Sequence, residues 1–209
     1  MLAWVLLTLA AVAALLFSEW RGLRAGVWIA KPLASAGFIA VALVAGARGS
    51  AYGIFVLVAL VLSWLGDVLL IPKARASFLA GLVSFLLGHV AFAAAFVVRG
   101  VSLPVLAIAA VLLLVPMAAA LRWLGPHVPD SMRIPVRAYV TVISSMAMCA
   151  AGTVFAAGNP AILAGALAFY VSDLAVARER FVAHSFTNKL WGLPLYYGAQ
   201  LLLASTVRG

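Results

Sequence analysis

Two aspartates, Asp67 and Asp173, are the residues of this sequence best suited to acid–base chemistry. Asp67 lies in LSWLGDVLLIP and Asp173 in FYVSDLAVARERF, both preceded by mostly apolar side chains. A charge near the centre of a membrane helix costs about 2.5–3.5 kcal/mol on insertion scales, and such a residue usually faces a bundle interior or a watery cavity. Two carboxyl groups in different surroundings can supply one protonated acid and one anion. We therefore interpret both as catalytic candidates. The alternative is that each pairs with a nearby Lys or Arg only to hold helices together.

Other polar side chains are expected near the ends of the helices at which Asp67 and Asp173 lie. Lys31, Arg137 and Lys189 stand close to where apolar runs begin, and they are the candidate cations of a binding site. The remaining candidates for binding are the polar residues Ser63, Tyr139, Asn188, Tyr196, Tyr197 and His89. Because a lone histidine in an apolar helix more often forms an interhelical hydrogen bond than acts as a catalyst, His89 is assigned to binding.

The composition indicates which elements must position these residues. Of the 209 residues, 67% are hydrophobic and only 9% are charged, which is not the balance of a water-soluble domain. One helical crossing of a bilayer needs about 20 mostly apolar residues. The long apolar runs lack the two-residue alternation of a membrane β-barrel, so helices must satisfy the backbone groups in lipid. The sequence therefore predicts an all-α polytopic membrane protein with one domain, residues 1–209.

Charges, glycines and prolines divide the chain into eight apolar segments, each expected to form one transmembrane helix. The segments are residues 2–18, 27–47, 51–71, 76–98, 101–121, 134–157, 159–177 and 186–206. Residues 122–133 form the one long connection between them. Because eight crossings are an even number, both termini should lie on the same side of the membrane.

The basic residues predict the orientation. Three lie on the side of the termini: Arg48, Arg99 and Arg208. Eight lie in the opposite loops: Arg21, Arg24, Lys73, Arg75, Arg122, Arg133, Arg178 and Arg180. Since basic loops stay in the cytoplasm, we expect the termini outside an inner (plasma) membrane. The net charge of +9 is scattered in ones and twos, so the expected partner is the lipid bilayer and not nucleic acid.

A repeated spacing suggests two parallel four-helix halves, residues 1–121 and 134–209. Lys31 and Asp67 are 36 residues apart (67 − 31), and Arg137 and Asp173 are separated by the same number (173 − 137). Both aspartates lie on helices expected to run towards the cytoplasm, which predicts a similar depth. Because the halves share little identity, chance is the alternative explanation of this spacing.

The sequence offers no set of metal ligands. Cys149 is the only cysteine, and no cluster of Cys or His accompanies the aspartates, so neither a metal site nor a cofactor is expected. The GxSxG elbow of serine hydrolases and the P-loop are also absent from the sequence.

The chain resembles the YhhN-like lysoplasmalogenases. The matching pieces follow the family's order along most of the chain: KP at 31–32, SWLGDVLL around Asp67, FLAGLVSFLLGHVAF at 78–92, FYVSDLAVARERF around Asp173 and LYYGAQLLL at 195–203. The resemblance implies a membrane hydrolase that cleaves the vinyl ether bond of lysoplasmalogen, a lysophospholipid held within the membrane. The products would be a fatty aldehyde and glycerophosphoethanolamine or glycerophosphocholine.

Vinyl ethers resist base and are cleaved by acid, through protonation of the outer vinylic carbon, an oxocarbenium ion, addition of water and collapse of a hemiacetal. We predict that one of the two aspartates donates the proton, and that the other stabilises the cation and activates water. Lys31, Arg137 and Lys189 are the expected ligands of the phosphate. The alternatives are a proton-coupled transporter, in which intramembrane carboxylates are equally ordinary, and a structural scaffold, which leaves the paired aspartates unexplained.

Overall fold

A computed structural model describes residues 1–72 and 74–208 of the chain. The described residues form eight α-helices, which confirms the predicted all-α class. They are α1 (Leu2–Arg21), α2 (Arg24–Val44), α3 (Ala51–Leu69), α4 (Arg75–Arg99), α5 (Leu103–Leu124), α6 (Asp130–Ala157), α7 (Pro160–Ala177) and α8 (Phe186–Ser205). A short 3₁₀ helix, η1 (Ala47–Gly49), precedes α3, and a π-helical turn, η2 (Arg178–Val182), extends α7.

The ends of the helices follow local signals in the sequence. Side chains of Ser50, Asn159 and Ser185 cap α3, α7 and α8 by accepting a hydrogen bond from a backbone N–H of the first turn. Helix α6 begins at Asp130, four residues before the predicted start. An acidic residue in the first turn favours this extension, as does the 3.0 Å ion pair between Asp130 and Arg133.

Seven of the described helices, α1 to α7, are long and apolar enough to cross a membrane. The remaining helix, α8, has 20 residues, as α1 has, but it is more polar. Its Asn188, Tyr196, Tyr197 and Gln200 side chains are buried inside the bundle. The chain is therefore a polytopic membrane protein, and α8 is one of the helices that carry polar side chains into the bundle.

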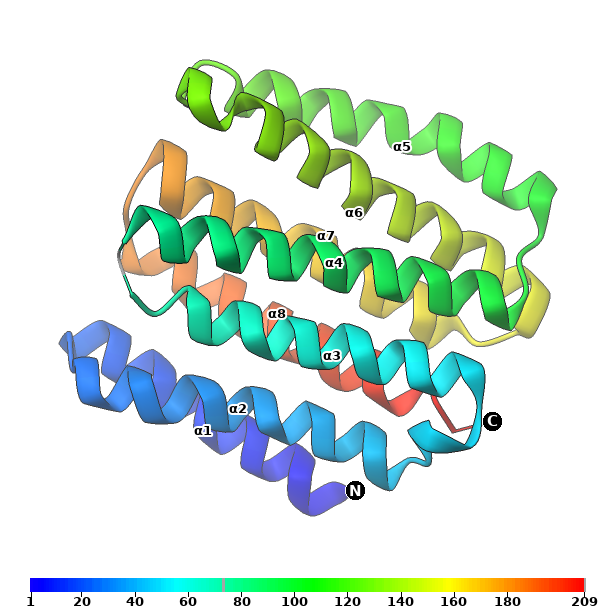
Figure 1. Ribbon diagram of the computed structural model, residues 1–209, viewed down its shortest axis with the longest axis horizontal. Helices are drawn as coiled ribbons and strands as arrows, with labels where there is room; N and C mark the ends of the chain where they lie inside the picture. Colours follow the sequence, from blue (N-terminus) through cyan, green and yellow to red (C-terminus); the bar gives the residue numbers. More distant parts are fainter. Residues whose placement is uncertain (73, 209) are drawn as a thin grey trace.

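The helices lie roughly along one axis, and both termini lie at the same end of the bundle (Figure 1). The connections α1–α2, α3–α4, α5–α6 and α7–α8 lie at the opposite end, which agrees with the predicted division of the loops. Lys73, one of the basic residues in that set of loops, lies outside the described residues. Which side of the membrane each end faces stays a prediction.

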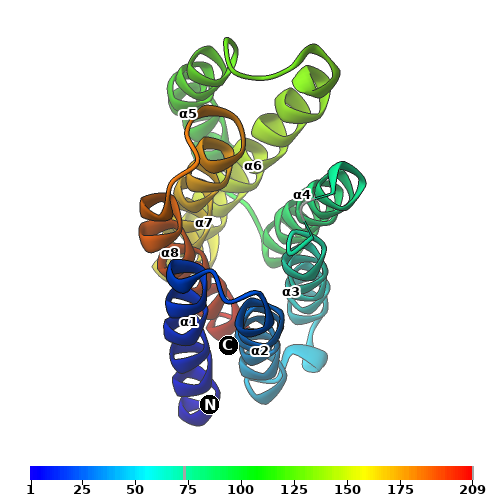
Figure 2. The same ribbon diagram turned by 90° about the vertical axis from the view of Figure 1, so that its left-hand side faces the viewer.

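Six helices pack as a closed ring in the order α2, α3, α4, α6, α7 and α8. Helix α1 packs outside this ring against α2 and α8, and α5 packs against α6 (Figure 2). Glycines let the helices approach closely beside both aspartates. A β-carbon at Gly66 would lie 2.6 Å from the Phe85 ring, and one at Gly192 would lie 2.5 Å from the Ala175 β-carbon.

Candidate functional site

A cavity of about 720 Å³ opens among the helices, and both Asp67 and Asp173 line it. Side chains of Arg24, Phe181 and Lys189 in its wall place it at the end of the bundle that holds the basic loops. Ligand pockets in proteins typically have volumes of about 300–1,000 Å³. The cavity is therefore large enough for a small organic molecule or part of a lipid.

Asp67 lies near the end of α3 and is only 2% exposed. Its Oδ2 atom accepts hydrogen bonds from Ser35 Oγ at 2.6 Å and from the Tyr196 hydroxyl at 2.8 Å. Its Oδ1 atom lies 3.3 Å from Lys31 Nζ, which forms a buried ion pair across α2 and α3. One cation and two hydroxyl donors thus surround this carboxyl group, which favours its anionic form.

Asp173 lies on α7 and has different partners. Its Oδ2 atom accepts a hydrogen bond from the Tyr139 hydroxyl at 2.7 Å. The same oxygen lies 3.5 Å from His89 Nε2. Among the described residues, no Lys or Arg lies within ion-pair distance of Asp173. The two carboxyl groups of the cavity therefore differ in the charge and type of their neighbours.

The equal spacing of the two basic–acidic pairs does not produce equal surroundings. Lys31 contacts Asp67, whereas Arg137 is exposed and lies outside the cavity. Arg137 instead lines a separate hollow together with Arg122 and Arg133. Tyr139, two residues further along α6, is the side chain that contacts Asp173.

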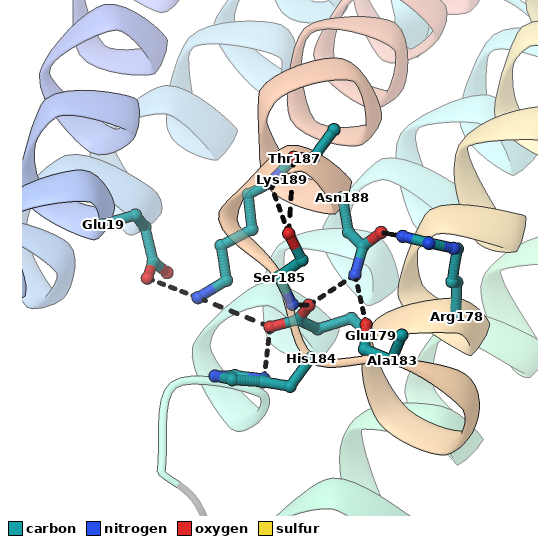
Figure 3. Close-up of polar contacts among 9 residues, drawn as sticks. All are labelled: Glu19, Arg178, Glu179, Ala183, His184, Ser185, Thr187, Asn188 and Lys189. Carbon is teal, nitrogen blue, oxygen red and sulfur yellow. Dashed lines mark hydrogen bonds and ion pairs between the residues drawn. The ribbon is translucent and has the colours of Figure 1, made fainter.

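A polar cluster lies at the outer part of the cavity, where α1, η2 and the start of α8 meet (Figure 3). Lys189 Nζ lies 2.7 Å from Glu19 Oε2 and 3.8 Å from Glu179 Oε1. Glu179 also lies 2.6 Å from His184 Nδ1 and accepts a 2.7 Å hydrogen bond from Asn188 Nδ2. We call these five residues the outer cluster.

The outer cluster was only partly expected from the sequence. Asn188 and Lys189 are candidates from the sequence, whereas Glu19, Glu179 and His184 are not among them. Lys189 forms ion pairs with two carboxylates, so its positive charge is already balanced by protein groups. The signal for the missed carboxylates is their scarcity: the chain has only five acidic residues, and Glu19 and Glu179 are two of them.

The remaining candidates lie behind the wall of the cavity. The Tyr197 hydroxyl lies 3.3 Å from Ser35 Oγ and 3.4 Å from the Lys31 carbonyl oxygen, so it supports the partners of Asp67. Ser63 is buried where α3 meets α4 and does not line the cavity. Ser35 was missed, although it follows Lys31 by four residues and so lies on the same face of α2.

A metal site would need several His, Cys, Asp or Glu side chains close together. Among the described residues, no three His, Cys, Asp or Glu side chains form a group that could hold a metal ion. The polar groups of the cavity are instead carboxyl groups, phenols, one imidazole and cations. This set of groups is able to donate and accept protons and to bind a charged headgroup.

Comparison with known proteins places this arrangement in a family. The chain is 31% identical over 155 residues to lysoplasmalogenase TMEM86A of Bos taurus, which covers 71% of this chain and 63% of that protein. It is 33% identical over 163 residues to the lysoplasmalogenases of Mycobacterium bovis and Mycobacterium tuberculosis, which covers 70% of this chain and 58% of each of those proteins. The chain thus spans about three fifths of the length of these curated relatives.

No solved structure matches the chain. The model that describes the YhhN family matches residues 26–207, which include both aspartates and all partners of theirs described above. The matched range extends from the first turn of α2 to just beyond the end of α8. The chain therefore belongs to the YhhN family.

Proposed function

We propose that the protein is a membrane hydrolase that cleaves the vinyl ether bond of a lysoplasmalogen to a fatty aldehyde and glycerophosphoethanolamine or glycerophosphocholine. The observation that carries the proposal is that Asp67 and Asp173 line one cavity with different partners. The names of the relatives, which are lysoplasmalogenases, support the substrate class. Acid-catalysed cleavage of a vinyl ether needs one proton donor and one anion, and this site has two carboxyl groups in unequal surroundings.

The partners of the two carboxyl groups favour one assignment of roles. Asp67 is paired with Lys31, so it acts as the anion that faces the developing positive charge and the attacking water. Its Oδ2 atom already accepts two hydrogen bonds, which leaves Oδ1 as the oxygen with spare capacity. Asp173 has no cationic Lys or Arg partner among the described residues, so it acts as the proton donor.

The protons balance over one catalytic cycle. Asp173 gives its proton to the outer vinylic carbon, and the ether carbon becomes part of an oxocarbenium ion. Water adds to that carbon while Asp67 takes its proton, and a hemiacetal results. The hemiacetal hydroxyl then returns a proton to Asp173, the carbon–oxygen bond to glycerol breaks, and Asp67 protonates the leaving oxygen. Both carboxyl groups end in the state in which they began.

The cavity also suggests where the rest of the substrate binds. Apolar side chains of its wall, among them Leu82, Phe85 and Ile143, suit the hydrocarbon chain. Arg24 and Arg180 line the cavity and have no ion-pair partner among the described residues, so we assign the phosphate to them. Arg180 also stacks over the Phe78 ring at 4.1 Å. The bound headgroup would then lie beside the outer cluster at the cytoplasmic face of an inner membrane.

The test is release of aldehyde by the purified protein in detergent micelles, where no transport can be scored. Lysoplasmalogen should yield aldehyde, and a saturated alkyl ether lysolipid should not. Asp173→Asn should abolish most of this turnover, whereas Asp130→Asn, the same change at a residue outside the cavity, should leave it unchanged. Absence of aldehyde from a folded, monodisperse preparation would favour the transporter alternative.

A further inference from the structure

His89 is a buried titratable group for which the proposed reaction has no role so far. It lies in the middle of α4 and is 1% exposed. Its ring packs against Phe169 and Tyr139, with centroid distances of 4.3 and 5.3 Å. Burial of an imidazole nitrogen without a hydrogen-bonding partner is costly, so the partner of each ring nitrogen determines its protonation state.

The contact of Nδ1 fixes the tautomer of the ring. His89 Nδ1 lies 2.7 Å from the carbonyl oxygen of Phe85. A carbonyl oxygen can only accept a hydrogen bond, so Nδ1 must carry a hydrogen. In the neutral ring, Nε2 therefore presents a lone pair and can only accept.

The lone pair on Nε2 faces a carboxyl group. Nε2 lies 3.5 Å from Asp173 Oδ2 and has no hydrogen-bond partner among the described residues. If both groups lacked a proton, two acceptors would face each other in a buried site without a donor between them. One proton on either group removes this conflict. Tyr139 donates its hydroxyl hydrogen to the same Oδ2 atom, so this hydrogen cannot also bridge Nε2 and the carboxylate.

We propose that His89 is a positioning residue that shares one proton with Asp173 and thereby keeps Asp173 ready to donate a proton. This inference rests on the proposed function. After Asp173 has protonated the vinylic carbon, the pair holds two facing acceptors and no proton, which favours return of a proton from the hemiacetal hydroxyl. His89 neither touches the substrate nor lines the cavity. The ionisable groups that face its ring from neighbouring helices are Tyr139 of α6 and Asp173 of α7.

The first experiment measures the shared proton without any substrate. In protein labelled with ¹⁵N-histidine, the Nε2 resonance of His89 should change on Asp173→Asn substitution and stay in place on Asp67→Asn substitution. His127 and His184 are exposed, so single His→Gln variants at these two positions assign the three signals. The proposal would be overturned if the His89 Nε2 resonance kept its position in the Asp173→Asn variant. It would also be overturned if the neutral ring carried its hydrogen on Nε2 and not on Nδ1.

The second experiment separates positioning from packing. His89→Gln offers an amide near the position of Nε2 but cannot hold the proton, so kcat for aldehyde release should fall by about 10²-fold while KM changes little. His89→Phe keeps a ring against Phe169 and should lose as much. His127→Gln, at an exposed residue outside the cavity, is the control and should retain turnover. Near-normal kcat in folded His89→Gln and His89→Phe would refute the role. If wild-type protein releases no aldehyde, the proposed function fails, and the ¹⁵N measurement still decides whether the proton is shared.

Discussion

Replacing Lys31 by methionine removes the cation beside Asp67 and keeps a side chain of similar length. Asp67 is 2% exposed, and its Oδ1 atom lies 3.3 Å from Lys31 Nζ. Loss of one partner of a buried ion pair costs about 3–5 kcal/mol. The hydrogen bonds from Ser35 and Tyr196 to Oδ2 remain and continue to stabilise the charge. We therefore expect the free energy of unfolding to fall by about 3 kcal/mol, the lower end of that range.

The reverse substitution should cost less. Asp67→Asn leaves Lys31 without its carboxylate, but the Lys31 side chain is 12% exposed and lines the cavity, so its ammonium group can reach water. Asparagine also keeps an oxygen for the two hydroxyl donors. We expect a loss of about 1–2 kcal/mol, close to that of a perturbed buried hydrogen bond. The double variant carries no buried charge at this place, so its loss should be smaller than the sum of the two single losses by at least about 1 kcal/mol.

The measurement is reversible unfolding in mixed micelles, followed by tryptophan fluorescence as the share of denaturing detergent rises. Asp130 and Arg133 form the control cycle, because their 3.0 Å ion pair lies on the surface and should contribute little. Losses for Lys31→Met and Asp67→Asn that add within about 0.5 kcal/mol would show that the two residues do not interact. In that case the argument that Asp67 is held as an anion would also fail.

Three further predictions concern topology, metal dependence and packing. Because the basic loops should face the cytoplasm, a reporter fused after Gly209 should be active only in an extracytoplasmic format, and activity of a cytoplasmic reporter would contradict the orientation. Carboxyl-driven protonation uses no Lewis acid, so turnover should survive treatment with EDTA; a loss that one divalent ion restores would refute this route. Gly192→Ala should destabilise the protein by about 1–3 kcal/mol because its β-carbon would overlap Ala175, whereas Gly198→Ala, where nothing lies within 4 Å, should be tolerated. Equal unfolding midpoints of these two variants would contradict the packing of α7 on α8.

Several polar residues of the cavity were predictable because charged and polar side chains are rare in membrane helices. Asp67, Asp173, Lys31 and Tyr139 stood out in apolar runs, and the structure brings all four to one cavity. The predicted helices are also present, since apolar length and basic loops largely determine a helical membrane protein. These features depend on composition along the chain and not on how the helices are rotated.

The pairings were less predictable because they depend on helix rotation. Residues 137 and 139 are two positions apart, which corresponds to about 200° around a helix, so only one of the two can face Asp173. Both residues are binding candidates in the sequence, and the packing of α6 on α7 presents Tyr139 to Asp173. Likewise, the contact of His89 with Asp173 crosses from α4 to α7, and a pattern within one helix cannot reveal it.

The last prediction asks whether the two carboxyl groups act as one unit. Asp→Asn preserves size and most hydrogen bonding and removes ionisation, so Asp67→Asn and Asp173→Asn should each insert and fold but lose about 10²–10⁴-fold in kcat. In the cycle proposed above, the proton that Asp173 delivers returns only after Asp67 has accepted one from water. Once either step is blocked, removal of the other carboxyl group can lower kcat only a little further. The double variant should therefore be little worse than the poorer single variant, and losses that multiply would mean that the two aspartates contribute independently of each other.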